Sequence, residues 1–299
     1  MEFGRVPTSQ LDQLDWRLPA EPAANGMVLG GTPAGSPRIY LGCSRWGHPG
    51  WVGRLYPPGT REKDFLARYV QHFGAVELNA THYKVYGASV VAGWAEKAAG
   101  RPFRFCPKMF KGVTHLGSLR GKETLTAEFL AGIGAFGEHL GPIFLQLSDQ
   151  FSPSRYAELA AYLDQLPAGW PFFLELRHPG WFTKEGPGER LFEQLRARQI
   201  GAVLTDTAGR RDCLHMQLTV PRAFIRYVGY GMHPTDLVRT GAWVTQIASW
   251  IRQGMEEVYF FLHLGEDDRA PELAVRLADQ LQAATGLAVQ KPSLTGLLF

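Results

Sequence analysis

The run FFLELR (residues 172–177) decides the fold that the sequence predicts. Every second residue is apolar throughout: Phe172, Leu174 and Leu176. The residues between them change from apolar Phe173 to charged Glu175 along the run. Because side chains of a strand alternate between its faces, one face is apolar along its whole length and the other carries charge only near its C-terminal end. This profile is typical of a strand in a parallel barrel, whose interior is filled below and reactive at the mouth.

Seven other short runs of apolar, β-branched and aromatic residues recur along the chain, and stretches with helical periodicity separate most of them. The runs are RIYLGC (38–43), AVELN (75–79), FRFCPK (103–108), PIFLQL (142–147), AVLTD (202–206), AFIRYV (223–228) and VYFFLH (258–263). The connection over residues 207–222 is the exception, since it is short and polar. Eight β–α units without a break in composition predict an α/β protein with a single (β/α)8 TIM-like barrel. A dinucleotide-binding sheet is disfavoured, because no GxGxxG turn follows the first run.

The first 37 residues differ from the rest of the chain. They contain five prolines and no sustained hydrophobic periodicity. We therefore expect an irregular Pro/Gly-rich extension over residues 1–37, with a short helical turn between Leu11 and Leu18, and a barrel domain over residues 38–299. We also expect the extension to be dispensable for folding of the barrel.

The same alternation, applied to the other runs, brings polar side chains together at the C-terminal mouth. The predicted inward set is Glu77, Asn79, Lys108, Gln146, Glu175, Arg177, Asp206, Arg226 and His263, whereas Val203 and its equivalents face the helices. Buried charges are costly unless they are paired or used. A structural ion-pair layer and a ligand pocket both fit, and we favour the pocket because barrel enzymes place their sites at this end. Three inward cations balance three carboxylates, which predicts one positive and one acidic wall.

Composition limits the class of protein. The chain has 299 residues, and 31 Lys+Arg against 28 Asp+Glu give a net charge of +3. This charge does not favour a dedicated nucleic-acid protein. Three cysteines without CxxC spacing argue against a disulfide framework and for a reducing compartment. No signal peptide or membrane-spanning run is visible, so we expect a cytoplasmic protein without a membrane partner.

Several chemistries fit the mouth. Glu175 and Asp206 on neighbouring strands could form the carboxylate pair of a glycosidase, although nearby cations would keep both ionised. The basic groups indicate an anionic ligand instead, because arginine matches carboxylate and phosphate geometry. We predict no cofactor. A divalent metal held by His263, Glu175 and Asp206 is the alternative, although no metal motif such as HExxH is present.

Aromatic residues follow the same strands. Trp46 and Trp51 lie in CSRWGHPGW after the first run, Tyr83 lies in NATHY after the second, and Trp181 lies in RHPGW after the fifth. Rings in such loops either stack on a ligand or cap the barrel. The tetrapeptide HPGW occurs at residues 48–51 and 178–181, a spacing that would match two half-barrels.

These motifs resemble the YecE-like family, known as domain of unknown function 72. LGCSRWGHPGW is similar to the family's Gly-x-Ser-x-Trp opening, VELNATHY to Val-Glu-x-Asn-x-x-Phe-Tyr, and FRFCPKMFKGVTH to Phe-x-Phe-x-x-Lys with a later Thr-His. FLQLSDQF is similar to Gln-Leu-Pro-x-x-Phe, and LELRHPGW to Glu-x-Arg-His-x-x-Trp. The resemblance spans residues 38 to about 285 and implies a TIM-like barrel without an established reaction. It departs at the eighth run, where His263 stands in place of part of a Phe-x-Asn-Asn motif.

Pattern and resemblance together predict a protein that binds a small anionic or polar organic molecule and transforms it by acid–base or hydrolytic chemistry. The predicted catalytic residues are Glu77, Lys108, Glu175 and Asp206. The predicted ligand-binding residues are Trp46, Trp51, Asn79, Tyr83, His115, Gln146, Arg177, His178, Trp181, Arg226 and His263. A non-catalytic ligand-binding or sensor protein is the first alternative, and nucleic-acid end processing is the second. No oligomeric state is predicted.

Overall fold

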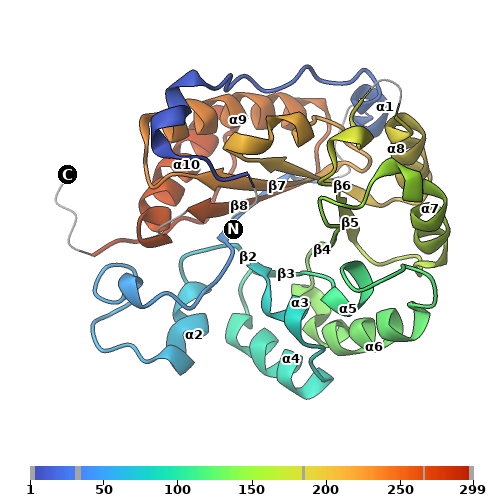
Figure 1. Ribbon diagram of the computed structural model, residues 1–299. Coiled ribbons are helices and arrows are strands. Elements are labelled where there is room, and N and C mark those ends of the chain that lie inside the picture. The colour runs from blue at the N-terminus through green and yellow to red at the C-terminus, as the bar shows by residue number, and fades with distance from the viewer. Residues whose placement is uncertain (1–3, 31–34, 184–185, 265–266, 296–299) are drawn as a thin grey trace.

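The described residues of the computed structural model form a nearly closed barrel of eight parallel strands (Figure 1), which confirms the predicted fold. The description covers residues 4–30, 35–183, 186–264 and 267–295, so parts of the predicted extension and barrel domain (residues 1–3, 31–34, 184–185, 265–266 and 296–299) lie outside the described residues. The strands are β1 Arg38–Cys43, β2 Ala75–Leu78, β3 Arg104–Pro107, β4 Ile143–Gln146, β5 Phe172–Glu175, β6 Gly201–Asp206, β7 Arg222–Gly229 and β8 Glu257–Leu264.

Hydrogen bonding runs in the order β3-β2-β1-β8-β7-β6-β5-β4. The two end strands, β3 and β4, are joined by isolated bridges that pair Phe105 with Leu140 and Lys108 with Phe144. The ring of strands is therefore complete apart from one weak seam. This seam lies beside Lys108, at the C-terminal end of β3.

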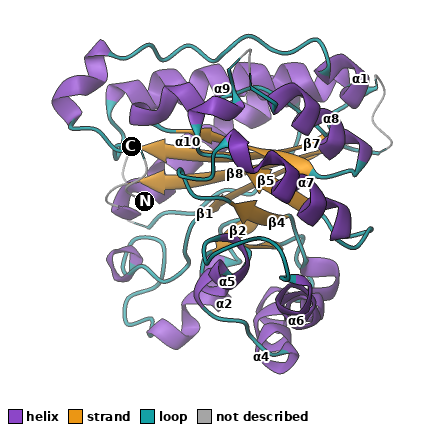
Figure 2. Ribbon diagram, turned by 45° about the vertical axis from the view of Figure 1, so that its right-hand side comes forward, coloured by secondary structure: helices purple, strands orange, loops and turns teal. Residues whose placement is uncertain are grey.

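Helices surround the strands, with α9 and α10 on one side and α2, α4 and α6 on the other (Figure 2). The α-helices are α1 Asn25–Leu29, α2 Phe65–Tyr69, α3 Ala80–Tyr83, α4 Ala88–Ala95, α5 Lys111–Thr114, α6 Glu123–Ile133, α7 Tyr156–Gln165, α8 Gly188–Ala197, α9 Pro234–Gln253 and α10 Ala270–Thr285. The connection after β6 forms only a 3-10 turn, Ala208–Cys213, as its short polar sequence predicts. Among the described residues, no helix has the length and apolar character needed to cross a membrane.

The barrel interior is built in two layers. The lower layer is an apolar cluster that includes Ala75, Cys106, Phe144, Phe173, Phe224 and Phe261. Two residues further along each of these strands comes the upper layer, because the side chains of a strand repeat with period two. The upper layer is polar: Glu77, Lys108, Gln146, Glu175, Arg226 and His263. Alternation along β2, β3, β4, β5, β7 and β8 thus has the predicted phase.

The phase of β6 is opposite to the prediction. Val203 belongs to the interior cluster, and Leu204 belongs to the outer core between barrel and helices. The cause is a contact across strands, since Gly201 pairs with Phe173 and a Cβ on Gly201 would lie 2.2 Å from the Phe173 ring. The aromatic ring of Phe173 therefore lies over Gly201 inside the barrel, so residues 201, 203 and 205 face inward. The inward orientation predicted for Asp206 is therefore wrong.

The N-terminal extension lies against the barrel and α9, and includes a 3-10 turn at Thr8–Gln13 and helix α1 (Figure 1). The carbonyl of Gly4 accepts hydrogen bonds from the Thr207 hydroxyl and the Gly209 amide, beyond β6. Further along, Glu21 accepts a hydrogen bond from the indole of Trp250 on α9. The extension is thus irregular but attached at several points. Its dispensability for folding stays a prediction.

Candidate functional site

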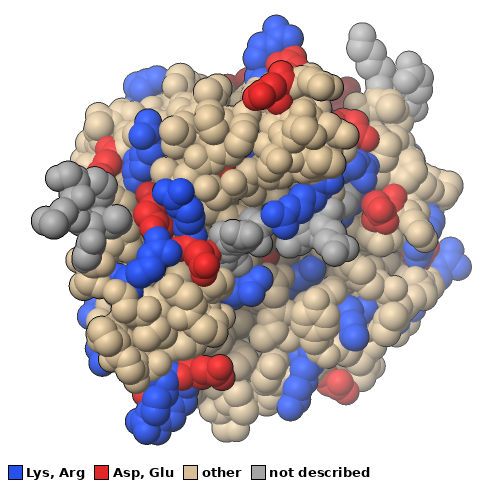
Figure 3. All heavy atoms as spheres, turned by 60° about the vertical axis from the view of Figure 1, so that its left-hand side comes forward, with Lys and Arg blue, Asp and Glu red and all other residues tan. Residues whose placement is uncertain are grey.

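A cavity of about 630 Å³ opens at the C-terminal ends of the strands. Figure 3 shows a face of the molecule on which Lys and Arg side chains, with carboxylates between them, surround a recessed centre. The cavity is lined by residues from seven of the strands or the loops that follow them: Ser44, Arg45, Trp46, Gly47, Glu77, Leu78, Asn79, Ala80, Tyr83, Lys108, Gln146, Arg177, Arg226 and His263. Nine of the fifteen predicted site residues are in this set. The sequence therefore located the mouth correctly.

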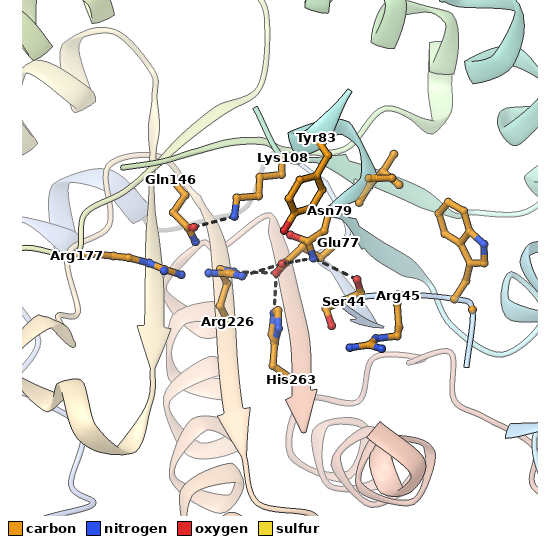
Figure 4. Close-up of a pocket in the computed structure, with 14 residues that line it drawn as sticks. Ser44, Arg45, Glu77, Asn79, Tyr83, Lys108, Gln146, Arg177, Arg226 and His263 are labelled. Atoms are coloured by element: carbon orange, nitrogen blue, oxygen red, sulfur yellow. Dashed lines mark hydrogen bonds and ion pairs between the residues drawn. The ribbon is translucent and has the colours of Figure 1, made fainter. Parts of the chain in front are cut away.

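Arg226 of β7 lies at the centre of the polar layer (Figure 4). Its Nε and Nη2 donate to the two oxygens of Glu77, each at 2.8 Å, and its Nη1 donates to Glu175 Oε2 at 2.7 Å. The guanidinium also lies 5.3 Å above the centre of the Phe144 ring, which belongs to the apolar layer. All three charged groups are almost fully buried. Arg226 therefore joins two carboxylates on opposite sides of the barrel.

Amide and imidazole groups extend this network. Glu77 Oε2 lies 2.8 Å from His263 Nε2, and its Oε1 accepts a hydrogen bond from the Asn79 amide at 3.0 Å. On the other side, the amide of Gln146 donates to Glu175 Oε2 at 2.8 Å. We call Glu77, Lys108, Gln146, Glu175 and Arg226 the mouth cluster. Because several groups bind each carboxylate, both carboxylates are fixed in place.

Both carboxylates are held in the ionised form. Burial acts to raise the pKa of Glu77, but the charges of Arg226 and His263 outweigh it and hold that pKa well below its usual range. Burial acts in the same direction on Glu175, where Arg177 and Arg226 lower the pKa to about 2. A carboxylate with so low a pKa is neither a proton donor near neutral pH nor a strong base. The geometry therefore assigns Glu77 and Glu175 a supporting electrostatic role.

Lys108 is in a different situation. Its side chain is 9% exposed, and Nζ donates to Gln146 Oε1 at 2.8 Å. Burial, followed by the nearby charge of Arg226, lowers its pKa from 10.5 to about 8. A pKa this close to neutrality makes an amine an effective acid or base. Lys108 is therefore the member of the mouth cluster best suited to proton transfer.

Asp206 lies outside the barrel, where it faces α9. Its Oδ1 accepts hydrogen bonds from Arg239 Nη2 at 2.7 Å and from Arg211, and its Oδ2 accepts one from the Trp243 indole at 2.8 Å. We call Asp206, Arg211, Arg239 and Trp243 the helix-layer cluster. Since Asp206 does not contribute to the mouth, the predicted balance of three cations and three carboxylates is wrong there. The two remaining carboxylates bind Arg226 between them, so the predicted acidic wall is absent from the described residues.

Two predicted ligand-binding tryptophans lie in the core instead. Trp51 and Trp181 end matching 3-10 turns, Pro49–Trp51 and Pro179–Trp181, which are formed by the two HPGW sequences. These turns direct both rings away from the mouth. Trp51 stacks near Tyr69, and the Trp181 indole donates to the carbonyl of Phe151. Both rings are buried and neither lines the cavity, so the predicted contact of Trp51 and Trp181 with a ligand is wrong in this structure.

The predicted histidines of the mouth loops also lie apart from the cavity lining. His178 accepts a hydrogen bond from the Gly180 amide and so caps the turn that carries Trp181. His115 follows α5 and lies edge-on to His82. Glu175 lies beneath the lining and reaches it through Arg177, Gln146 and Arg226. His115, His178 and Glu175 are therefore not part of the cavity lining.

Sequence reasoning missed five lining residues, Ser44, Arg45, Gly47, Leu78 and Ala80, of which Ser44 and Arg45 have polar side chains. Both follow β1 directly, and the carbonyl of Ser44 accepts a hydrogen bond from Asn79. Their signal was their place after a strand, in the CSRW motif, although only the tryptophan of that motif was singled out. Among the described residues, no group of three or more His, Cys, Asp or Glu side chains is arranged to hold a metal ion.

Comparison with known proteins identifies the family of this chain. The sequence model of the family described as "Protein of unknown function DUF72" matches residues 40–295. The chain belongs to the DUF72 family. It is 30% identical over 262 residues to the UPF0759 protein YecE of Escherichia coli, which covers 82% of this chain and 93% of YecE. The resemblance inferred from the motifs is thus confirmed.

Solved DUF72 structures have the same fold. A DUF72 family protein of Enterococcus faecalis matches with a TM-score of 0.63 and 18% identity, over 87% of this chain and 100% of its own. One of Thermotoga maritima matches with a TM-score of 0.62 and 21% identity, over 82% and 99%. At this identity the likeness concerns the fold alone.

Proposed function

We propose that the DUF72 mouth is an active site that binds a small organic molecule with an anionic group, and that Lys108 transfers a proton to or from it. The observation that carries the proposal is Lys108 itself, a buried amine that lines the cavity with a pKa of about 8. Buried lysines with lowered pKa values are typical of acid–base and amine catalysis. The neutral form of Lys108 is substantially populated near pH 8 and can accept a proton there.

The carboxylates support this assignment by their own bonding. Glu77 and Glu175 were the general acid and base of the hypothesis from sequence, but each is bound to Arg226 and ionised. Their role in the proposal is to hold Arg226 beneath the ligand. Arg226 then disfavours the charged form of Lys108, which favours the neutral amine. The mouth cluster thus tunes one reactive group.

The ligand is bound by the rest of the lining. Arg177 and Arg45 supply positive charge, and arginine is well matched to a carboxylate or phosphate group. Trp46 and Tyr83 add ring surface at the opening. A cavity of about 630 Å³ is of the size that binds small organic molecules. The inner cations, Lys108, Arg177 and Arg226, exceed the two carboxylates by one charge when Lys108 is protonated, which favours an anion.

The test needs no knowledge of the natural substrate. A panel of small carboxylic acids, sugar acids and organic phosphates is first screened for compounds that raise the melting temperature of the protein. Each binder is then incubated with the protein in D2O, and loss of its C–H signals is followed by proton NMR. We expect at least one binder to exchange hydrogen with solvent, because a poised amine removes and returns a proton.

Two variants make the result specific. Lys108→Met should abolish the exchange and keep binding of the anion at Arg177. Lys111→Met, which changes a lysine that does not line the cavity, should leave exchange unaltered. Binding without exchange by any compound would instead support the non-catalytic ligand-binding or sensor function. Exchange that survives in Lys108→Met would contradict the role of Lys108.

A further inference from the structure

Lys108 lies near the charges of Glu175 and Glu77, but among the described residues it forms no ion pair with either. Among the described residues, the carboxylates of the mouth pair with Arg226 and Arg177, and none forms an ion pair with Lys108 Nζ. The described hydrogen bond of Nζ goes to a neutral amide oxygen, Gln146 Oε1. A buried cation without a paired anion is strongly disfavoured. Burial without an ion pair therefore lowers the pKa of Lys108 to about 8, so that a neutral amine is substantially populated near that pH.

The orientation of that amine is also fixed. Gln146 donates from Nε2 to Glu175 and accepts at Oε1 from Lys108, so its amide cannot turn without breaking a bond to an ionised group. One N–H of the tetrahedral Nζ is thus directed at Gln146. When the amine is neutral, its lone pair and second N–H occupy the other positions. Because Lys108 lines the cavity, these positions are open to a ligand (Figure 4).

An oriented, neutral and accessible amine is a nucleophile as well as a base. We propose that Lys108 forms an imine with a small carbonyl compound that carries a carboxylate next to its carbonyl group, a 2-oxo acid. This inference rests on the proposed function, since it names the substrate class of the same site. It makes Lys108 a catalytic residue that bonds to the substrate.

The step balances without a further reactant. The lone pair of Nζ attacks the carbonyl carbon, and a carbon–nitrogen bond forms. The carbonyl oxygen takes up both hydrogens of the neutral amine and leaves as water, which gives the imine. The positively charged form of the imine draws electrons from the neighbouring carbon, so that its C–H bond becomes acidic. Proton exchange with solvent then follows at that carbon.

The carboxylate preference comes from Arg177. Its Nε donates to Glu175 Oε1 at 2.7 Å, and Glu175 is bound in turn to Gln146, the partner of Lys108. Arg177 and Lys108 are thus fixed by one chain of hydrogen bonds and line one cavity. A ligand with its carboxylate at Arg177 would direct an adjacent carbonyl toward this part of the mouth. Glu175 itself is saturated and does not compete for that position.

The experiment traps the imine in the full-length protein. Pyruvate is added with sodium cyanoborohydride, which reduces an imine to a stable secondary amine, and the modified lysine is located by peptide mass spectrometry. We expect Lys108 to be labelled more than a hundredfold faster than the exposed lysines near pH 7, since its pKa is lowered from 10.5 to about 8 and each unit raises the neutral fraction tenfold. Pyruvamide, which has the same ketone without the charge, should label Lys108 more slowly.

The outcomes are decisive for this inference and for the proposed function separately. Labelling of Lys108 in preference to Lys111, abolished in Lys108→Arg, supports imine formation. Equal labelling of all lysines would overturn it, and so would equal rates for pyruvate and pyruvamide. If exchange of a ligand's hydrogens depends on Lys108 but no adduct is trapped, the imine is excluded and the proposed proton transfer stands. If neither exchange nor an adduct is seen with any compound, both proposals fail.

Discussion

The mouth cluster and the helix-layer cluster are built from the same materials. The mouth cluster has two carboxylates and the helix-layer cluster has one, all bound by arginines at hydrogen-bond distance, and each cluster is almost fully buried at its centre. In the helix-layer cluster, Asp206 is bound by two arginines and an indole. In the mouth cluster, the carboxylates are likewise saturated, but a lysine that forms no described ion pair lies beside them.

The two clusters also differ in whether they face the cavity. The mouth cluster faces a cavity, whereas none of the four helix-layer residues lines that cavity, and Trp16 of the extension covers Arg239. Buried charge alone is therefore no sign of a site, because saturated ion pairs serve structure equally well. The mouth differs because it contains Lys108, an ionisable group that lines the cavity and forms no described ion pair. Four substitutions test this distinction.

The largest effect is expected at Arg226. Arg226→Met leaves the buried Glu77 without its main counter-charge and the buried Glu175 with only Arg177, which should cost about 3–5 kcal/mol of unfolding free energy at pH 7. Burial then acts to raise the pKa of both carboxyls in the folded state. Because the folded variant would bind more protons than the unfolded chain, its stability should rise as the pH falls from 7 toward 5. Urea unfolding across this pH range measures both effects.

A matched control separates charge from packing. The triple variant Arg226→Met, Glu77→Gln, Glu175→Gln removes the two carboxylates together with Arg226, keeps Lys108 and Arg177, and should recover part of the loss. If it is as unstable as the single variant, the volume of Arg226 rather than its charge holds the mouth together. If Arg226→Met is nearly neutral, the ion pairs contribute little and the mouth cluster is not a fixed platform.

Asp206 should show a smaller effect confined to stability. Asp206→Asn removes the charge that pairs with the buried Arg239, although Arg239 keeps its hydrogen bonds to the carbonyls of Val228 and Asp206. We expect a loss of about 2–3 kcal/mol by urea unfolding. Stabilisation by small carboxylates should be unchanged, as measured by the shift in melting temperature. A loss of anion binding would show that the two clusters act together.

Substitution of Lys108 should raise the stability of the protein near pH 7, whereas the two substitutions above lower it. Its folded-state pKa of about 8 lies below the unfolded 10.5, so the unfolded chain binds more protons between these values and wild-type stability rises with pH there. At pH 7, Lys108→Met removes a buried charge, which raises the free energy of unfolding, and it also removes one hydrogen bond, which lowers it. The net gain should be about 1–2 kcal/mol. The advantage should disappear by pH 10.5.

This result would mark Lys108 as a functional residue, since a site that costs stability is retained for another reason. Unfolding of both proteins at pH 7 and pH 10 provides the measurement. The parallel substitution Lys111→Met should give no pH-dependent difference between variant and wild type. A variant of Lys108 that is less stable at pH 7 would indicate that Lys108 stabilises the mouth as a cation.

The eight strands and most of the mouth could be predicted because a polar residue near the end of a strand sets the phase of its alternation. In FRFCPK and PIFLQL, Lys108 and Gln146 follow apolar interior residues at a spacing of two. In AVLTD the two polar residues are adjacent, so Thr205 and Asp206 could each define the inner face. The decision came from Gly201 beneath Phe173, a contact across strands that no single run contains.

The directions of loop side chains were harder to predict, because they too depend on contacts between distant parts of the chain. The HPGW sequences predict turns, but the direction of each ring depends on distant partners such as Tyr69 for Trp51 and Phe151 for Trp181. Arg45 and Ser44 carry no periodicity that distinguishes a residue facing the cavity from one facing solvent. Strand residues inherit their direction from alternation, whereas loop residues obtain it from tertiary contacts.

Trp16 should give the smallest effect and tests whether the cover of the helix-layer cluster matters. Its ring lies 4.6 Å from the Arg239 guanidinium and 5.6 Å from that of Arg211, and it is half-buried. Trp16→Ala should cost about 0.5–1 kcal/mol in urea unfolding, the range of cation–π contacts near a surface.

Met27→Ala, which changes an exposed apolar residue of the same extension, is the control and should change little. Imine trapping at Lys108 should be unaffected, because the arginines that Trp16 is described as contacting, Arg211 and Arg239, both belong to the helix-layer cluster. A loss as large as that of Asp206→Asn would mean that the extension is part of the folding core, and a change in trapping would mean that the two clusters are coupled.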